Sequence, residues 1–176
     1  MLFRSVDLVS VYVDQFPEND LSRDRSKRFN VPIYPTIAEA LTMGGSKLAV
    51  DGVIIIAEHG KYPRNHRNQT LYPRYEFMKQ TVDVFKASGR AAPVFNDKHL
   101  STDWDKCAEM VRWSKELGFA YLAGSSLPVT CRMPAIDMPY GAKLEASVCV
   151  CYGGVDSYDF HGLETAQCMS ERRAGG

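Results

Sequence analysis

Short apolar runs alternate with stretches of helical periodicity along the chain, and this alternation predicts a parallel sheet with helices between its strands. The runs expected to form strands are Val6–Val13, Val31–Tyr34, Val50–Ala57, Ala92–Phe95, Phe119–Ala123 and Leu144–Cys151. The stretches expected to form helices lie at about 20–29, 36–43, 73–88, 101–117 and 158–173. We therefore expect an α/β fold of Rossmann-like character, with a mostly parallel sheet and flanking helices.

Three of these segments give sharper expectations. Val50–Ala57 is the most apolar run, which predicts a strand covered on both faces. In the helix at 101–117, Ser101 or Thr102 is the expected cap, and an apolar stripe of Trp104, Cys107 and Val111 is expected to face the core. In Leu144–Cys151, the two cysteines lie two residues apart, so a strand would point both thiols to the same side.

Composition narrows the class of protein. The 176 residues include 21 Lys+Arg and 21 Asp+Glu, and 45% of the chain is hydrophobic, which is typical of a folded globular protein. Zero net charge argues against nucleic acid as a partner, because such binding needs an excess of Lys and Arg near phosphate. No apolar stretch approaches the roughly 20 residues of a membrane-spanning helix, and the first ten residues lack a secretory-signal pattern.

Cysteine usage bears on the compartment. The chain has five cysteines, at positions 107, 131, 149, 151 and 168, and no CxxC pair. An odd number at irregular spacing argues against a disulfide framework or a zinc knuckle. We therefore expect reduced, structural thiols in a cytoplasmic protein.

Candidate ligand-binding residues follow the predicted strands, because ligands of an open parallel sheet bind beyond the carboxyl ends of its strands. This rule selects Asp14, Glu58 with His59, Asn96-Asp97-Lys98-His99, and Ser125 with Ser126. Strand ends must turn, and turns are polar whether or not they bind a ligand, so each group taken alone also fits an ordinary loop.

Two of these residues have specific chemical alternatives. An acid that closes a strand, such as Asp14, can accept hydrogen bonds from the ribose hydroxyls of NAD, or it can be a solvent-facing loop acid. Lys98 can donate to a substrate oxygen and stabilise charge there, or it can simply pair with Asp97 at the surface. His59 can act as a base, although a lone loop histidine more often makes only local hydrogen bonds.

Other chemistries lack their motifs. Asp156, Asp159 and His161 lie close together in sequence, but Asp159 and His161 are too close to lie on successive turns of one helix face. No third metal ligand is therefore clearly positioned, and we expect no metal site. Ser125 and Ser126 are not in a GxSxG elbow, and there is no GxxxxGK[ST] loop, which argues against serine hydrolase and nucleoside-triphosphatase activity. A sugar-phosphate lyase or isomerase would need a metal site or phosphate loop that the sequence does not offer.

The order of elements resembles the N-terminal half of the glucose–fructose oxidoreductase/inositol dehydrogenase (Gfo/Idh/MocA) family. Thr36–Leu41 matches that family's capped-helix pattern, and the Thr36 hydroxyl and Glu39 form a capping box. Val50–Ile56 matches its "v-D-x-V-x-i" strand, and Asn96-Asp97-Lys98-His99 stands where the family has Glu-Lys-Pro. The resemblance extends over about residues 6–126 and more loosely over 140–176.

The resemblance implies a Rossmann domain that binds NAD or NADP and a second α/β domain that holds a sugar, cyclitol or related polyhydroxy compound, which is oxidised by hydride transfer. It assigns Lys98 and His161 to catalysis, although Ser157 stands where the family's D-x-x-x-H segment has its aspartate. It assigns Asp14 to the cofactor ribose. Among the other strand-end residues, we place Glu58, His59, Asn96 and Asp97 on the cofactor side. The resemblance also implies that the protein forms homo-oligomers, which associate through the second domain.

The family's first strand and GxGxxG loop would precede Val6, so we expect a fragment that lacks the first βα unit. Residues 1–126 would be an incomplete NAD(P)-binding domain, and residues 127–176 a linker with the beginning of the substrate domain. Without the first strand, the strands ending at Asp14 and Ala57 must either pair with each other or leave a gap. The alternative function is a non-catalytic Rossmann-like binding or interaction module.

Overall fold

The strands are shorter than the apolar runs that predict them, while most of the helices keep their predicted length. A computed structural model describes residues 6–175. Its elements, in chain order, are β1 (Val11–Tyr12), α1 (Ser22–Phe29), β2 (Ile33–Tyr34), α2 (Ile37–Thr42), β3 (Val53–Ile55), α3 (Arg74–Ser88), β4 (Val94–Asp97), α4 (Trp104–Leu117), β5 (Tyr121–Gly124), the short 3-10 turn η1 (Leu127–Val129) and α5 (Val155–Ser170).

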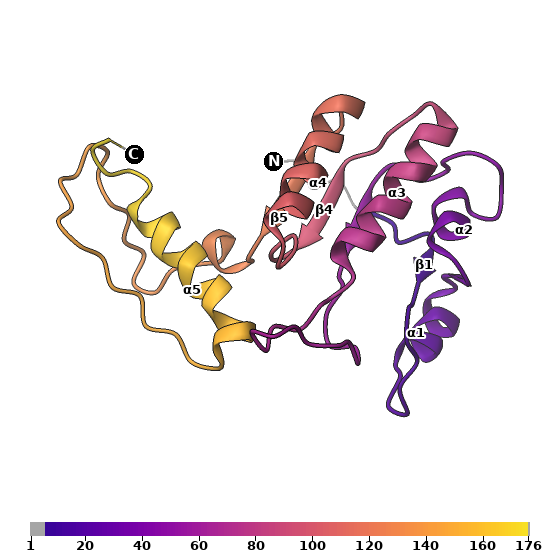
Figure 1. The fold of residues 1–176 in the computed structure, drawn as a ribbon, viewed down its shortest axis with the longest axis horizontal. Coiled ribbons are helices and arrows are strands. Elements are labelled where there is room, and N and C mark those ends of the chain that lie inside the picture. The colour runs from indigo at the N-terminus through magenta and orange to yellow at the C-terminus, as the bar shows by residue number, and fades with distance from the viewer. Residues whose placement is uncertain (1–5, 176) are drawn as a thin grey trace.

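The strands form two separate parallel sheets. β1 pairs with β2, and β3, β4 and β5 form a second sheet in that order, with Val53 opposite Val94 and Val94 opposite Tyr121. The expected α/β class, with parallel strands flanked by helices, is confirmed and is consistent with a Rossmann-like fold (Figure 1). β1 and β3 are not paired, so of the two expected arrangements the described chain adopts the one with a gap.

Local signals explain the helix starts. Thr36 caps α2 as predicted, because its hydroxyl oxygen accepts the backbone N–H of Glu39 at 3.1 Å. The cap predicted for α4 was wrong: Asp103 takes that role and accepts the N–H of Lys106 at 3.1 Å, while the Ser101 hydroxyl accepts the N–H of Asp103. A carboxylate at this position stabilises the helix N-terminus by charge as well as by hydrogen bonding.

The core lies between the three-stranded sheet and the helices α3 and α4, which run side by side (Figure 1). α3 contributes Met78, Val82 and Phe85, all 1% exposed or less, at the spacing of three and four residues that one helix face requires. The stripe predicted for α4 was wrong, because Trp104 is 82% exposed and the helix buries Met110 and Trp113 instead. Met110, Trp113 and Leu117 are spaced three and four residues apart, so they share the face that packs on the core, whereas Val111 is 38% exposed.

The expectation that β3 is covered on both faces was also wrong. Ile55 is buried, but Ile54 and Ile56 are 62% and 67% exposed, and Leu122 of β5 is 67% exposed. Successive side chains of a strand point to opposite faces, and α3 and α4 lie against only one of them. The opposite face of the sheet therefore presents an apolar surface within the described residues.

Residues 125–175 contribute α5 and long irregular segments that lie to one side of the sheet (Figure 1). The strand predicted at Leu144–Cys151 is absent: these residues form no strand and no ladder hydrogen bonds in the described chain. The predicted C-terminal helix is present as α5, Val155–Ser170. At the other end, the strand expected over Val6–Val13 is reduced to Val11–Tyr12.

Within residues 6–175, no helix is both long enough and apolar enough to cross a membrane.

Candidate ligand site at the strand ends

Lys98 lies at the carboxyl edge of the three-stranded sheet, between two carboxylates from neighbouring strand ends. Its ammonium is 2.6 Å from Oε2 of Glu58, which follows β3, and 2.6 Å from Oδ2 of Asp97, the last residue of β4. The three side chains are 13–21% exposed. Burial lowers the pKa of Lys98, but hydrogen bonds to Asp97 and Glu58 outweigh this, so the pKa lies above its ordinary value and the ammonium stays charged.

A tight turn after β4 holds Lys98 in this position. Lys98 has a left-handed backbone with φ of 68°, which a non-glycine residue adopts only when its surroundings compensate. The compensation comes from Asn96, which is fully buried and whose amide nitrogen lies 3.2–3.5 Å from the carbonyl oxygens of Asp97, Lys98 and His99. The Lys98 N–H also donates to the carbonyl of Gly124 in β5.

Arg74, at the start of α3, lies beneath this edge. Its side chain is 1% exposed, and Nη1 is 2.9 Å from Nε2 of His99. Since a guanidinium can only donate, His99 Nε2 accepts and the ring proton sits on Nδ1. Burial, and then the positive charge of Arg74, lower the pKa of His99 to about 4, so the imidazole is neutral near pH 7.

Burial also lowers the pKa of Arg74, which the negative charges of Glu58 and Asp97 partly oppose. Nε and Nη2 of Arg74 have no hydrogen-bond partner within the described residues. A buried guanidinium with two unpaired nitrogens is costly unless another acceptor reaches it. This edge of the sheet therefore combines charged side chains with unused donor capacity.

Helix α5 packs over the same edge. Its Asp156 accepts two hydrogen bonds from Thr70, from the backbone N–H at 3.1 Å and from the hydroxyl at 3.0 Å. Nδ1 of His161 lies 2.5 Å from the Ser125 hydroxyl, just after β5, and Glu164 accepts the Ser125 N–H at 3.3 Å. These contacts bring the predicted residue His161 to the strand ends, where it pairs with Ser125.

Asp14 lies in a separate group beside the two-stranded sheet. Its two carboxylate oxygens accept hydrogen bonds from the Tyr12 hydroxyl at 2.7 Å and the Tyr62 hydroxyl at 2.9 Å. Burial and the hydrogen bond to Asp14 raise the pKa of Tyr12 to about 12, so the phenol keeps its proton and remains a donor. Both oxygens of the carboxylate predicted to bind ribose are thus already engaged by tyrosines.

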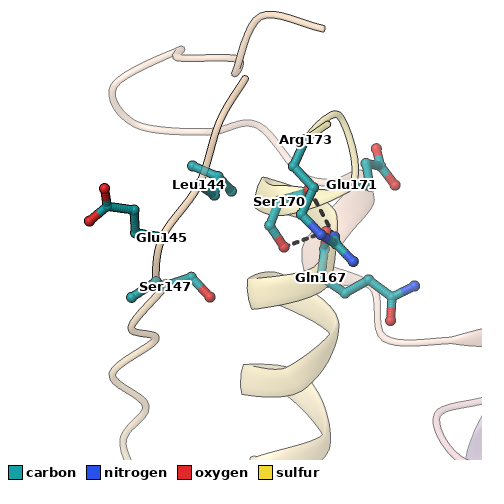
Figure 2. Close-up of a pocket in the computed structure, with 8 residues that line it drawn as sticks. Leu144, Glu145, Ser147, Gln167, Ser170, Glu171 and Arg173 are labelled. Atoms are coloured by element: carbon teal, nitrogen blue, oxygen red, sulfur yellow. Dashed lines mark hydrogen bonds between the residues drawn. The ribbon is translucent and has the colours of Figure 1, made fainter. Parts of the chain in front are cut away.

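The remaining predicted residues do not join the cluster. His59 is exposed and has a left-handed backbone with φ of 66°. Across residues 6–175, no group of three or more His, Cys, Asp or Glu side chains is placed to hold a metal ion, and that includes Asp156, Asp159 and His161. A groove lies elsewhere, between residues 144–147 and the C-terminal end of α5, lined by polar side chains such as Gln167, Ser170 and Arg173 (Figure 2).

Sequence reasoning missed Arg74 and Thr70. A signal for Arg74 was present, since it lies four residues before Met78 on the buried stripe of α3, a position where an exposed cation does not fit. Thr70 had no such signal, because its partner Asp156 is 86 residues away in sequence.

The side chains at the strand ends suit a ligand rich in hydroxyl groups. The carboxylates of Glu58 and Asp97 can accept hydrogen bonds from hydroxyl groups, and the ammonium of Lys98 can donate a hydrogen bond to a ligand oxygen at the same place. Comparisons with protein families, with curated proteins and with solved structures found no match to this chain.

Proposed function

We propose that the protein binds a sugar, cyclitol or related polyhydroxy compound where β3, β4 and β5 end, and that it is an oxidoreductase-like protein of the Gfo/Idh/MocA kind. The observation that supports the proposal is the position of the Lys98 ammonium, 2.6 Å from carboxylates of two adjacent strand ends. A polyhydroxy compound offers both donors and acceptors at each carbon, and this group of side chains supplies complements to both.

In the proposed reaction, a substrate hydroxyl would be oxidised, and the resemblance implies NAD or NADP as the group that would take the hydride. Lys98 would donate a hydrogen bond to the reacting oxygen and stabilise the negative charge that develops on it. His161, beside Ser125 on the facing helix, is the second proposed group for moving the proton.

The described residues do not fit the dinucleotide itself. Asp14 is engaged by Tyr12 and Tyr62, and the 176 residues contain no GxGxxG loop to bring a pyrophosphate to a helix N-terminus. The residues at the strand ends therefore act only on the substrate side of the proposed reaction.

A second candidate is a non-catalytic binding module on the same scaffold. The observation in its favour is that Tyr12 and Tyr62 already engage the carboxylate of Asp14, so a ligand at Lys98 would bind without a dinucleotide held by that residue. Both candidates predict ligand binding at this edge, but only the first predicts oxidation.

The test compares wild-type chain with Lys98→Met and with Lys79→Met, an exposed lysine that pairs with Asp83 on α3. Binding of myo-inositol, glucose and gluconate is measured by saturation-transfer NMR, and formation of NADH or NADPH is followed with NAD⁺ or NADP⁺ present. Binding that Lys98→Met abolishes and Lys79→Met preserves supports the site, and formation of NADH or NADPH favours the oxidoreductase. Binding without any oxidation favours the module, and binding insensitive to Lys98 contradicts both.

A further inference from the structure

Cys149 and Cys151 lie side by side on the extended segment that runs along α5. Their Sγ atoms are 3.8 Å apart, although neither residue belongs to a strand of the described chain. Val150, between the two cysteines, and Val148, before them, are 90% and 88% exposed, and both cysteines are also exposed. Residues two apart on an extended backbone lie on the same side, which agrees with the contact between the two thiols.

Gly162 of α5 makes room for these sulfur atoms. A Cβ built on this glycine would lie 2.2 Å from Sγ of Cys151 and 4.0 Å from Sγ of Cys149. Any side chain at position 162 would therefore displace the Cys151 sulfur. Figure 2 shows the neighbouring part of the same segment, residues 144–147, running alongside α5.

The three other thiols have different surroundings. Cys107 donates to the carbonyl of Ser101 at 3.6 Å, and Cys168 lies 3.8 Å from the carbonyl of Pro128 and 3.1 Å from Nη2 of Arg132. Cys131 is exposed. Among the described thiols, only Cys149 and Cys151 are recorded in contact with each other.

We propose that Cys149 and Cys151 form a reversible dithiol–disulfide pair whose oxidant is a small disulfide of the glutathione type. The thiolate of one cysteine attacks the oxidant, forms a mixed disulfide and releases one thiol. The second thiolate then attacks the protein sulfur of that mixed disulfide and releases the other thiol. The two protein thiols are oxidised, one small disulfide is reduced to two thiols, and the two protons pass to the released thiolates or to solvent.

The geometry favours a labile bond over a permanent one. A disulfide needs a sulfur–sulfur distance of about 2.05 Å, so the two sulfurs must approach each other by nearly 2 Å. A disulfide between cysteines with only one residue between them closes a small, strained ring. Strained and exposed disulfides are the ones that are readily reduced. The pair is thus suited to respond to the redox state of its surroundings.

The test equilibrates the whole chain with mixtures of reduced and oxidised glutathione, traps free thiols by alkylation and analyses the tryptic peptide 144–172 by mass spectrometry. Because this peptide also contains Cys168, Cys168→Ser is the background for the measurement. The expected result is a peptide two hydrogens lighter than its fully reduced, unalkylated form. In the variant that also carries Cys149→Ser, this peptide should disappear, and a glutathione adduct should appear in its place. Bridges to Cys168 in the wild-type chain, or only glutathione adducts in Cys168→Ser, would overturn the proposal.

Two further measurements separate the folded geometry from the intrinsic chemistry of a CxC sequence. The disulfide equilibrium constant should be at least about tenfold larger for the folded chain than in urea, and Gly162→Ala should change it by about threefold or more. Equal constants in the folded chain and in urea would show that the fold does not bring the thiols together, and an unchanged constant for Gly162→Ala would contradict their contact with α5.

Discussion

The guanidinium of Arg74 donates to the imidazole of His99 across 2.9 Å, while the carboxylates of Glu58 and Asp97 pair with Lys98. This contact fixes the tautomer of His99 and makes a second positive charge beside Arg74 unfavourable. Glu58 and Asp156 lie close enough to oppose this effect in part, but burial and Arg74 dominate.

The first prediction concerns pH. The folded pKa of His99 is about 4, below the ordinary 6.5, so the unfolded chain binds more protons between these values. Stability should therefore be fully present above about pH 6.5 and fall as the pH drops toward 4, by on the order of 2 kcal/mol after allowance for solvent screening. Urea unfolding at pH 7 and pH 4.5 measures the change, with His99→Gln as the control. If His99→Gln shows the same pH dependence in this window as the wild type, the effect does not arise at His99.

The second prediction concerns the ion pairs of Lys98. Lys98→Met leaves Glu58 and Asp97 facing each other without their shared cation, which should destabilise the fold by about 1–3 kcal/mol at pH 7. Combining it with Glu58→Gln should restore part of that loss because the like-charge repulsion is removed. Chemical denaturation of the wild type and the two variants measures these differences, and a double variant less stable than Lys98→Met would contradict the proposed repulsion.

The third prediction concerns how α5 is held on the strand ends. Asp156→Asn weakens two hydrogen bonds to Thr70, and Ser125→Ala removes the hydroxyl that meets His161. Both should raise amide hydrogen exchange throughout α5 while leaving exchange in α3 unchanged, because α3 belongs to the main core. Asp159→Asn, on the same helix but without a recorded contact to the sheet, is the matched control. Exchange in α5 equal to that of the control would show that these contacts do not hold the helix.

A fourth prediction concerns the cap of α4. Asp103→Ala should cost about 1 kcal/mol of stability, whereas Thr102→Ala should cost only a few tenths, because only Asp103 accepts a hydrogen bond from the first turn. Thermal unfolding of the two variants distinguishes the cap found in the structure from the one expected from sequence.

The fifth prediction concerns the uncovered face of the sheet. With Ile54, Ile56 and Leu122 more than 60% exposed and the sheet divided in two, the isolated chain should melt below about 60 °C and associate at high concentration. Replacing Ile54 and Leu122 with Thr should reduce association, measured by light scattering, with little change in melting temperature. A cooperative transition well above 60 °C would contradict this account.

Much of the architecture could be predicted because it depends on local signals. The buried positions of α3 follow its periodicity, and Thr36 caps α2 as its sequence indicates. The two-sided burial of β3 could not be predicted in the same way, since an apolar run alone does not specify which elements cover it. The sequence of Leu144–Cys151 favours a strand, but a strand also needs a neighbour, and the described chain supplies none.

The sequence predicted some residues of the candidate site but not all of them. The rule that ligands bind at strand ends brought Glu58, Asp97 and Lys98 together correctly, since parallel strands end at one edge. It could not separate Asp14, because that residue belongs to the other sheet. The contacts of α5 depend on long-range packing, and no local pattern around Asp156 or His161 indicated their partners.

The measurement that tests the central claim most directly is ligand binding at Lys98. The account predicts that a polyhydroxy compound such as myo-inositol binds the wild-type chain and the Lys79→Met chain alike, and that Lys98→Met weakens binding by about tenfold or more, as expected for loss of a charged hydrogen bond. Equal binding by wild type and Lys98→Met, or no binding of any polyhydroxy compound to the folded chain, would contradict it.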